Sequence, residues 1–131
     1  MANNNHLIDK YIDALLVEAA LRKNELNSET ITTVYLGGGT PSLLSSTQLS
    51  KLVNGLKKVF DFSDLEEFTI EVNPDDVTAY YIQQAKSLGI NRVSMGVQSF
   101  SDEDLRFINR RHTAKQATDA IHIIKESGIN N

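Results

Sequence analysis

Hydrophobic residues follow two different periodicities along this chain, and the two alternate. A spacing of three to four residues predicts amphipathic helices, which we place at residues 7–25, 45–59, 77–88 and 113–127. Short runs rich in β-branched and aromatic residues predict strands, which we place at residues 31–36, 67–72 and 91–97. A short helix with acidic residues in its first turn is expected from Ser101. Helices that alternate with strands in this way favour parallel strands joined by right-handed crossovers, so the predicted fold class is α/β.

Local sequence signals mark several of the helix ends. Ser45 with Gln48, and Thr113 with Gln116, have the spacing of a capping box, in which two side chains satisfy backbone N–H groups at a helix start. Gly89 follows the third long helix and can adopt the left-handed backbone that ends a helix. These signals place the starts of two helices and the end of a third.

One short sequence pattern occurs twice. Lys-Ser-Leu-Gly-Ile-Asn at 86–91 leads into a predicted strand, and Lys-Glu-Ser-Gly-Ile-Asn at 125–130 resembles it. Asn131 is therefore expected where a further strand would begin, and the first helix would normally follow a strand. We expect residues 1–131 to be a fragment of one larger α/β domain.

The composition indicates a globular domain and excludes several other classes of protein. The 131 residues are 40% hydrophobic and 23% charged, which suits one globular domain, and the formal net charge of -4 gives no electrostatic argument for nucleic acid. No apolar run approaches the roughly 18 residues of a membrane span. The start of the chain is polar and lacks a signal-peptide pattern, so we expect a fraying tail at residues 1–6 and a cytoplasmic location. The chain contains no cysteine and can form neither a disulfide nor a thiolate metal site.

The strongest candidate for chemistry is the end of the first strand. There the apolar run is followed by Gly37, Gly38 and Gly39, and then by Thr40 and Pro41. A backbone without Cβ atoms can bring its N–H and C=O groups close to a ligand. The segment matches neither a Walker A loop nor the dinucleotide-binding glycine pattern, and a tight strand-to-helix turn without a ligand is the alternative.

Polar residues follow the ends of the other two strands. Glu71 lies at the end of the second strand and Gln98 follows the third, and the C-terminal ends of parallel strands share one edge of a sheet. We therefore expect a site for a small polar ligand there. Met95 and Phe100 are expected in the core. The acidic pair at 75–76 is expected to cap a helix rather than to bind metal.

Four sequence blocks together identify a resemblance to a known family. They are Tyr-Leu-Gly-Gly-Gly-Thr-Pro-Ser at 35–42, Ile-Glu-Val-Asn-Pro at 70–74, the run at 89–100 that ends in Gly-Val-Gln-Ser-Phe, and Asn-Arg-Arg-His at 109–112. In this order they resemble radical S-adenosylmethionine proteins of the oxygen-independent coproporphyrinogen III oxidase family, which includes close relatives regarded as haem chaperones. The resemblance implies part of a (β/α)6 partial barrel of the TIM type, represented here by about three parallel strands with flanking helices.

The resemblance also implies a cofactor site. S-adenosylmethionine would lie across the strand ends against a [4Fe-4S] cluster, with its methionine part near Gly38, Gly39 and Thr40. Exposed backbone amides and carbonyls suit an amino acid moiety.

Three side chains complete the site that the resemblance implies. Glu71 would accept hydrogen bonds from the cofactor's amino group or ribose, Gln98 would bond the ribose hydroxyls, and Arg110 would pair with the carboxylate. Without the resemblance, Glu71 could meet a helix N-terminus and Gln98 could be loop scaffolding. The run at 110–112 could be a solvated charge run or the partner of a helix dipole.

The chain departs from the family at the cluster. Members hold the cluster with three cysteines in a C-x3-C-x2-C loop, and this chain has none, so we expect those cysteines upstream. For residues 1–131 alone we expect no bound cluster and no stably bound cofactor, with S-adenosylmethionine binding weakly if at all. For the whole protein, the resemblance implies oxidative decarboxylation of porphyrin propionate side chains through a 5′-deoxyadenosyl radical, or alternatively haem binding and delivery without oxidase activity. We expect the chain itself to be an inactive half-barrel. It should self-associate through an open strand edge or an inner face that carries residues such as Val34, Leu36, Ile70 and Val93, or their alternating neighbours.

Overall fold

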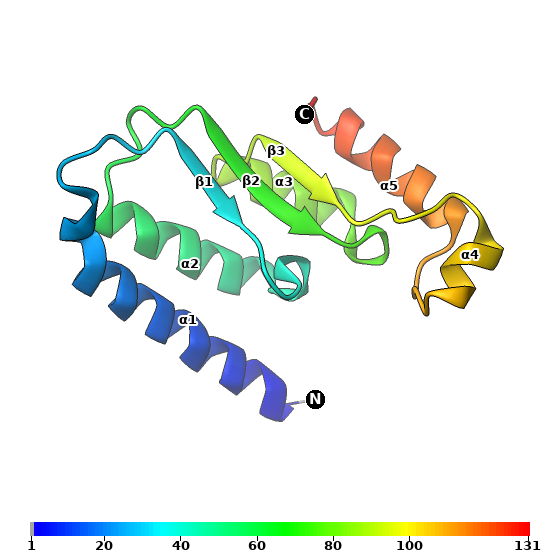
Figure 1. Cartoon of the computed structure of the whole chain (residues 1–131), viewed down its shortest axis with the longest axis horizontal. Coiled ribbons are helices and arrows are strands. Elements are labelled where there is room, and N and C mark those ends of the chain that lie inside the picture. Colours follow the sequence, from blue (N-terminus) through cyan, green and yellow to red (C-terminus); the bar gives the residue numbers. More distant parts are fainter. Residues whose placement is uncertain (1) are drawn as a thin grey trace.

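A computed structural model describes residues 2–131, with side chains from Asn5 onward. Three parallel strands form one open sheet in the order β1–β2–β3, and Figure 1 shows them side by side. The strands are β1 (Thr33–Leu36), β2 (Glu67–Val72) and β3 (Arg92–Met95). The register aligns Leu36 with Ile70 and Ile70 with Val93. The predicted α/β class and parallel pairing are confirmed.

In the described part of the chain, five α-helices and three short 3-10 helices connect or flank the strands. The α-helices are α1 (Ala2–Arg22), α2 (Ser46–Val59), α3 (Ala79–Ser87), α4 (Asp102–Phe107) and α5 (Ala114–Glu126). The 3-10 helices are η1 (Lys23–Leu26), η2 (Pro41–Leu43) and η3 (Pro74–Asp76). Both predicted capping boxes are present, at the starts of α2 and α5. Within residues 2–131 no helix is both long enough and apolar enough to cross a bilayer.

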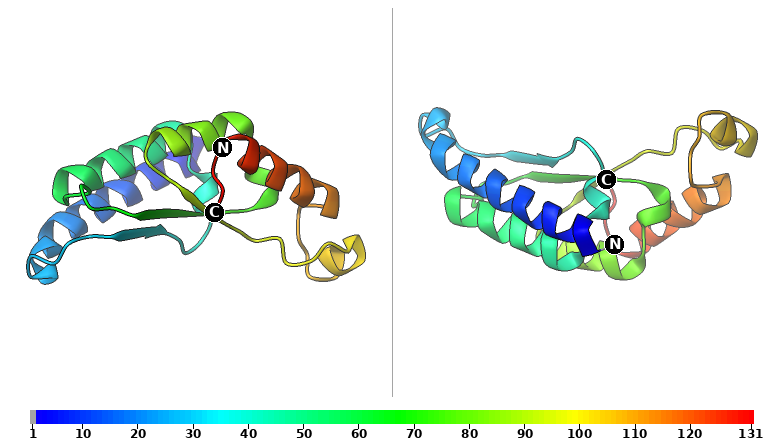
Figure 2. Two further views of the ribbon diagram at one scale, coloured as in Figure 1. Left: turned by 90° about the horizontal axis from the view of Figure 1, so that it is seen from above. Right: turned by 90° about the horizontal axis from the view of Figure 1, so that it is seen from below.

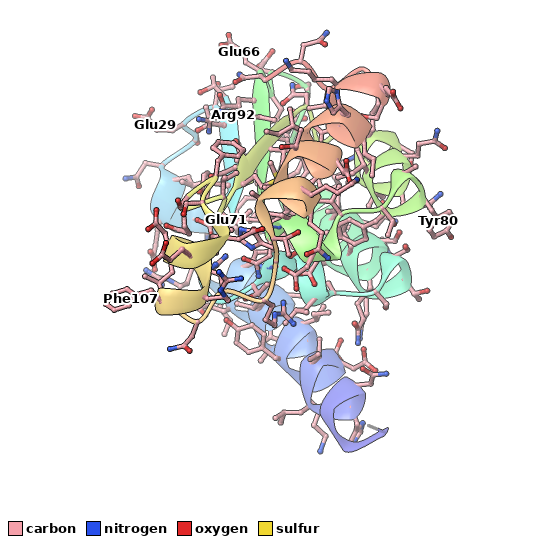
Figure 3. All side chains as sticks on the ribbon, turned by 90° about the vertical axis from the view of Figure 1, so that its right-hand side faces the viewer. Glu29, Glu66, Glu71, Tyr80, Arg92 and Phe107 are labelled. Atoms are coloured by element: carbon pink, nitrogen blue, oxygen red, sulfur yellow. The ribbon has the colours of Figure 1, made fainter. Side chains whose placement is uncertain are left out.

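The long helices cover one face of the sheet, and the other face is bare, as Figure 2 shows. Alternate residues of a strand point to opposite faces, so Phe68, Ile70 and Val72 of β2 are buried beneath the helices. The face without helices carries the residues between them, Thr69 and Glu71, of which Thr69 is nevertheless buried. In Figure 3, Arg92 lies on the side of the sheet away from α3 and α5.

This arrangement decides between the two alternatives for the inner face, in favour of the alternating neighbours. Val34, Leu36, Ile70 and Val93 all pack in or against the core on the helix side. Their alternating neighbours carry hydroxyl, carboxylate and guanidinium groups. The bare face of the sheet is therefore polar, because the strand period of two assigns the apolar set to the side that the helices cover.

The first helix differs from its prediction. It begins at Ala2 rather than at residue 7, so the predicted fraying tail is wrong for residues 2–6, where no glycine or proline interrupts the helix. Residue 1 of that predicted tail lies outside the described residues. Leu16 packs directly over Gly55 of α2, where a Cβ atom would lie 2.5 Å from the leucine side chain. This close approach joins α1 to α2 and leaves the far side of α1 uncovered.

Two further expectations are corrected near the strand ends. The third long helix starts at Ala79, capped by Thr78, because η3 occupies the residues just before it. Phe100 is 62% exposed rather than in the core, whereas Met95 packs against the core cluster. At the far edge of the sheet the Val93 N–H donates to Asn131 O over 3.0 Å, so the backbone of Asn131 lies beside β3, as the repeated pattern predicts.

Candidate functional site

A pocket of about 420 Å³ lies where the three strands end. Its walls come from the loops after β1, β2 and β3 and from the segment after α4. The lining residues are Gly39, Thr40, Pro41, Glu71, Val72, Asn73, Ser94, Met95, Gly96, Gln98 and Arg110. Five of the six predicted site residues line this pocket. The sixth, Gly38, donates a backbone hydrogen bond to Glu71, which is one of the five.

The glycines after β1 meet two different requirements. Gly38 and Gly39 have φ angles of 79° and 67°, in the left-handed region that favours glycine, and a Cβ atom on either would meet nothing within 4 Å. Gly37 instead lacks space, because a Cβ atom there would fall within 2.4 Å of the Tyr35 ring. The loop can therefore turn sharply over the strand end while leaving backbone groups accessible.

Glu71 connects the glycine loop to the sheet. Its Oε2 accepts from the Gly38 N–H over 3.1 Å, and its Oε1 accepts from the Tyr35 hydroxyl over 2.7 Å. Glu71 therefore binds the glycine loop and Tyr35, and not a helix N-terminus as in the alternative interpretation. A carboxylate has about four acceptor positions, so both oxygens keep capacity for a ligand. Tyr35 was missed in the sequence, although the β1–β2 register places it opposite Thr69 and hence diagonal to Glu71.

Three polar side chains converge over the backbone of Gly96. A Cβ atom built on Gly96 would lie 3.3 Å from Arg110 Nη2, 3.5 Å from Gln98 Nε2 and 3.6 Å from Asn73 Oδ1. Arg110 Nη2 donates to Asn73 Oδ1 over 2.9 Å and to Gly96 O over 3.1 Å. A Cβ atom at this position would touch all three groups, most closely Arg110 Nη2, so glycine gives them the most room to meet. Asn73 and Gly96 are site residues that the sequence analysis did not single out as contacts.

Arg110 keeps an unused donor. Among the described residues, two buried side-chain nitrogens have no hydrogen-bond partner, Arg110 Nε and His112 Nδ1. Buried donors are normally paired, and a charged donor left unpaired is costly. The Arg110 guanidinium is anchored through Nη2 and lines a pocket that also contains the Glu71 carboxylate. One group of each charge suits a zwitterionic ligand.

The acidic pair after β2 has a different role from the predicted one. No side-chain capping bond is present in η3. Instead, Asp75 Oδ2 lies 3.0 Å and Asp76 Oδ1 3.6 Å from Arg111 Nη2. The capping prediction is wrong because the segment 110–112, distant in sequence, folds back onto this turn. It is not a solvated charge run, since Arg110 and His112 point inward.

A buried serine links the first two loops. Ser42 Oγ donates to Asp76 Oδ2 over 2.7 Å and accepts from the Asn73 N–H over 3.2 Å. The Tyr81 hydroxyl donates to Pro41 O over 3.3 Å from α3. Burial, followed by the charge of Asp76, raises the pKa of Tyr81 to about 12, so this hydroxyl keeps its proton. The loop after β1 is thus held to the loop after β2.

Other candidate sites are weaker. A cavity of about 580 Å³, larger than the first, lies near the opposite ends of the strands and is lined by residues of 23–31 and 59–64. It contains none of the predicted site residues. Within the part of the chain that the structure describes, no group of three or more acidic or histidine side chains could hold a metal ion.

Comparisons with known proteins show the family of this chain. The family model of the radical SAM superfamily matches residues 4–131. The heme chaperone HemW of Lactococcus lactis is 39% identical over 124 residues, which are 95% of this chain and 32% of the relative. The oxygen-independent coproporphyrinogen III oxidase of Escherichia coli is 34% identical over 110 residues, 84% of this chain and 24% of the relative.

Solved structures show the same fold. The radical SAM enzyme coproporphyrinogen III oxidase (HemN) from Escherichia coli superposes with a TM-score of 0.86 at 31% identity, over 96% of this chain and 29% of that one. The Elp3 protein of Methanocaldococcus infernus superposes with a TM-score of 0.64 at 22% identity, over 86% of this chain and 32% of that one, which shows the fold alone. The chain spans about a third of the length of the HemW relatives. It belongs to the radical SAM superfamily and is related to both the HemW heme chaperones and the oxygen-independent coproporphyrinogen III oxidases.

Proposed function

We propose that the pocket at the strand ends binds S-adenosylmethionine. The observation that carries the proposal is the meeting of Gln98, Arg110 and Asn73 over Gly96, beside a glycine loop tied to Glu71. The pocket thereby offers a carboxylate, a guanidinium, an amide and free backbone groups within one small volume. This set matches an amino acid moiety joined to a ribose.

Each predicted residue has a part in this proposal. The backbone of Gly38, Gly39 and Thr40 would hold the methionine part, and the Arg110 guanidinium, which lines the pocket, would pair with its carboxylate. Glu71 would accept from the amino group or the ribose through its remaining lone pairs. The Gln98 amide, as both donor and acceptor, suits a ribose hydroxyl.

The residues present do not fit the second group that the family implies. An iron–sulfur cluster is held by thiolates, and this chain has no cysteine. We propose that the cluster ligands belong to sequence outside residues 1–131. When bound beside a reduced cluster, the cofactor supplies radical chemistry, and the part of this chain would be to bind and orient the cofactor.

For the whole protein we propose a role in handling haem. The HemW relatives of Lactococcus lactis and Bacillus subtilis share 39% and 38% of residues with this chain over 95% of its length, against 34% over 84% for the oxidase. Oxidative decarboxylation of a porphyrinogen is the second candidate, supported by the TM-score of 0.86 with the oxidase structure. Haem retained after desalting by the whole protein, without carbon dioxide release from coproporphyrinogen III, would support the first over the second.

The cofactor proposal can be tested on this chain by NMR. In a titration of the ¹⁵N-labelled protein with S-adenosylmethionine, we expect weak binding that shifts the backbone amides of Gly38, Gly39, Gly96 and Gln98. Amides around the cavity at 23–31 should stay in place. Glu71→Gln should reduce the shifts, whereas Glu66→Gln, on an exposed residue at the other end of the sheet, should not. No response of the loop amides at millimolar cofactor would overturn the proposal.

A further inference from the structure

His112 is the most buried ionisable side chain next to the candidate site, with 2% of its surface exposed. It immediately precedes Thr113, which caps α5, and its Nε2 lies 2.9 Å from Val97 O. A carbonyl oxygen can only accept, so Nε2 carries a proton in this contact. The other ring nitrogen, Nδ1, is buried and has no partner among the described residues.

The carbonyl that His112 holds belongs to a strained turn. Val97 O also accepts from the Ser99 N–H over 2.8 Å, which closes a three-residue turn centred on Gln98. Gln98 has a φ of 65°, in the left-handed region that residues with a side chain rarely adopt. A γ-turn with positive φ at its centre is rare and strained, and it persists only where surrounding contacts over-determine it.

Residues 110–112 supply the contacts that hold this turn in place. Arg110 Nη2 donates to Gly96 O and His112 Nε2 to Val97 O, so two successive carbonyls before Gln98 are held by one segment. Gln98 itself is exposed, and its amide nitrogen is directed over Gly96 into the pocket. The direction of this side chain therefore depends on the backbone of the turn.

An apolar side chain of similar size would fill the same space without leaving Nδ1 unpaired. An unsatisfied buried acceptor carries a cost, so the imidazole is best explained by what its other nitrogen does. His112 is not among the residues that line the pocket.

We propose that His112 is a positioning residue for the cofactor site. Its Nε2–H holds Val97 O, and through it the strained turn that presents Gln98 to the pocket. The effect of His112 on cofactor binding rests on the proposed function. Its hydrogen bond to Val97 O, which stabilises the turn, does not.

Paired substitutions separate this role from simple core packing. The amide nitrogen of glutamine can take the place of imidazole Nε2, whereas that of asparagine lies nearer to Nδ1 and falls short of Val97. We compare His112→Gln with His112→Asn and His112→Leu, and use His122→Leu, on an exposed residue of α5, as the control. Long-range ¹H–¹⁵N spectra of the unsubstituted chain should show the Nε2–H tautomer.

Two readouts are needed. Without cofactor, hydrogen exchange of the Ser99 amide reports the turn, and we expect faster exchange in His112→Asn and His112→Leu but not in His112→Gln or His122→Leu. With S-adenosylmethionine, the same two variants should bind about three to ten times more weakly, the loss expected for one net hydrogen bond.

The outcomes distinguish the two proposals. If the Leu variant does not fold, the Gln and Asn variants decide. Equal Ser99 exchange in those two variants, or an Nδ1–H tautomer, would overturn the role of His112. If the unsubstituted chain does not respond to the cofactor, the proposed function fails, and the Ser99 exchange still decides whether His112 holds the turn.

Discussion

The hydroxyl of Tyr35 donates to Glu71 Oε1 over 2.7 Å, across two neighbouring parallel strands. The other carboxylate oxygen receives the Gly38 N–H, so a residue of β1 fixes the acid that in turn fixes the loop after β1. The glycine loop is thereby held in place before any ligand arrives, which lowers the ordering cost of binding.

Removing this hydroxyl should loosen the loop. Tyr35→Phe is expected to lower the free energy of unfolding by about 0.5–1 kcal/mol, below the range for a hydrogen bond to a charged group because the ring is half exposed. Urea unfolding followed by circular dichroism measures this change. Tyr80→Phe, on an exposed tyrosine of α3, serves as the matched control, and equal midpoints for the two variants would contradict the prediction.

The two adjacent arginines should behave differently toward the cofactor. Arg110→Ala is expected to weaken S-adenosylmethionine binding by about 1.5–3 kcal/mol, the range for a lost hydrogen bond to a charged group. Arg111→Ala removes contacts to Asp75 and Asp76 outside the pocket and should change binding little. Calorimetry of the whole protein or NMR titration of this chain measures both, and unchanged binding in Arg110→Ala would return that residue to a scaffold role.

Stability should fall at high pH because of Tyr81. The pKa of Tyr81 is raised by burial and then by Asp76 to about 12, above the value of about 10 in an unfolded chain. The group therefore stabilises the fold fully below about pH 10, and this contribution is lost as the pH rises toward about 12, by up to about 2 kcal/mol. Urea midpoints across this range should fall more steeply for the unsubstituted chain than for Tyr81→Phe, and parallel curves would refute the assignment.

Iron and sulfide should not assemble on this chain alone. Because no thiolate is available, anaerobic reconstitution followed by desalting is expected to leave the protein colourless. A stoichiometric broad absorption in the usual iron–sulfur region that survives desalting would contradict this expectation. A cysteine-containing member of the same family, treated in parallel, is the positive control.

Self-association stays a prediction, and the structure changes where it should occur. The bare face of the sheet is polar, whereas Leu7, Tyr11, Val17 and Leu21 on α1 are 59–78% exposed, and the outer edge of β1 has no partner strand within residues 2–131. Exposed apolar surface and open strand edges both favour pairing, so we expect a two-fold dimer.

Light scattering over a concentration series tests this prediction. Leu21→Glu should raise the dissociation constant if α1 forms the contact, whereas Phe107→Ser, on the exposed side chain that projects from α4 in Figure 3, should leave it unchanged. A monomer mass at all concentrations would refute self-association.

Sequence patterns were sufficient to predict contacts between residues that are close in the sequence. The capping boxes at Ser45 and Thr113 formed as predicted, because each joins groups only three residues apart. The alternation of helices and strands also determined the parallel sheet, and with it the shared edge where Glu71, Gln98 and the glycine loop line one pocket. Period and chain direction are properties of the sequence itself.

Only the tertiary structure decided which side of each element faces water and which distant segments meet. The polar bare face, the exposed Phe100 and the ion pair of Asp75 with Arg111 all depend on where helices and loops pack after the chain folds back. The hold of His112 on Val97 is of the same kind, since these residues are 15 apart and belong to different segments. A one-dimensional pattern records spacing along the chain, whereas these contacts depend on distances between segments that folding alone establishes.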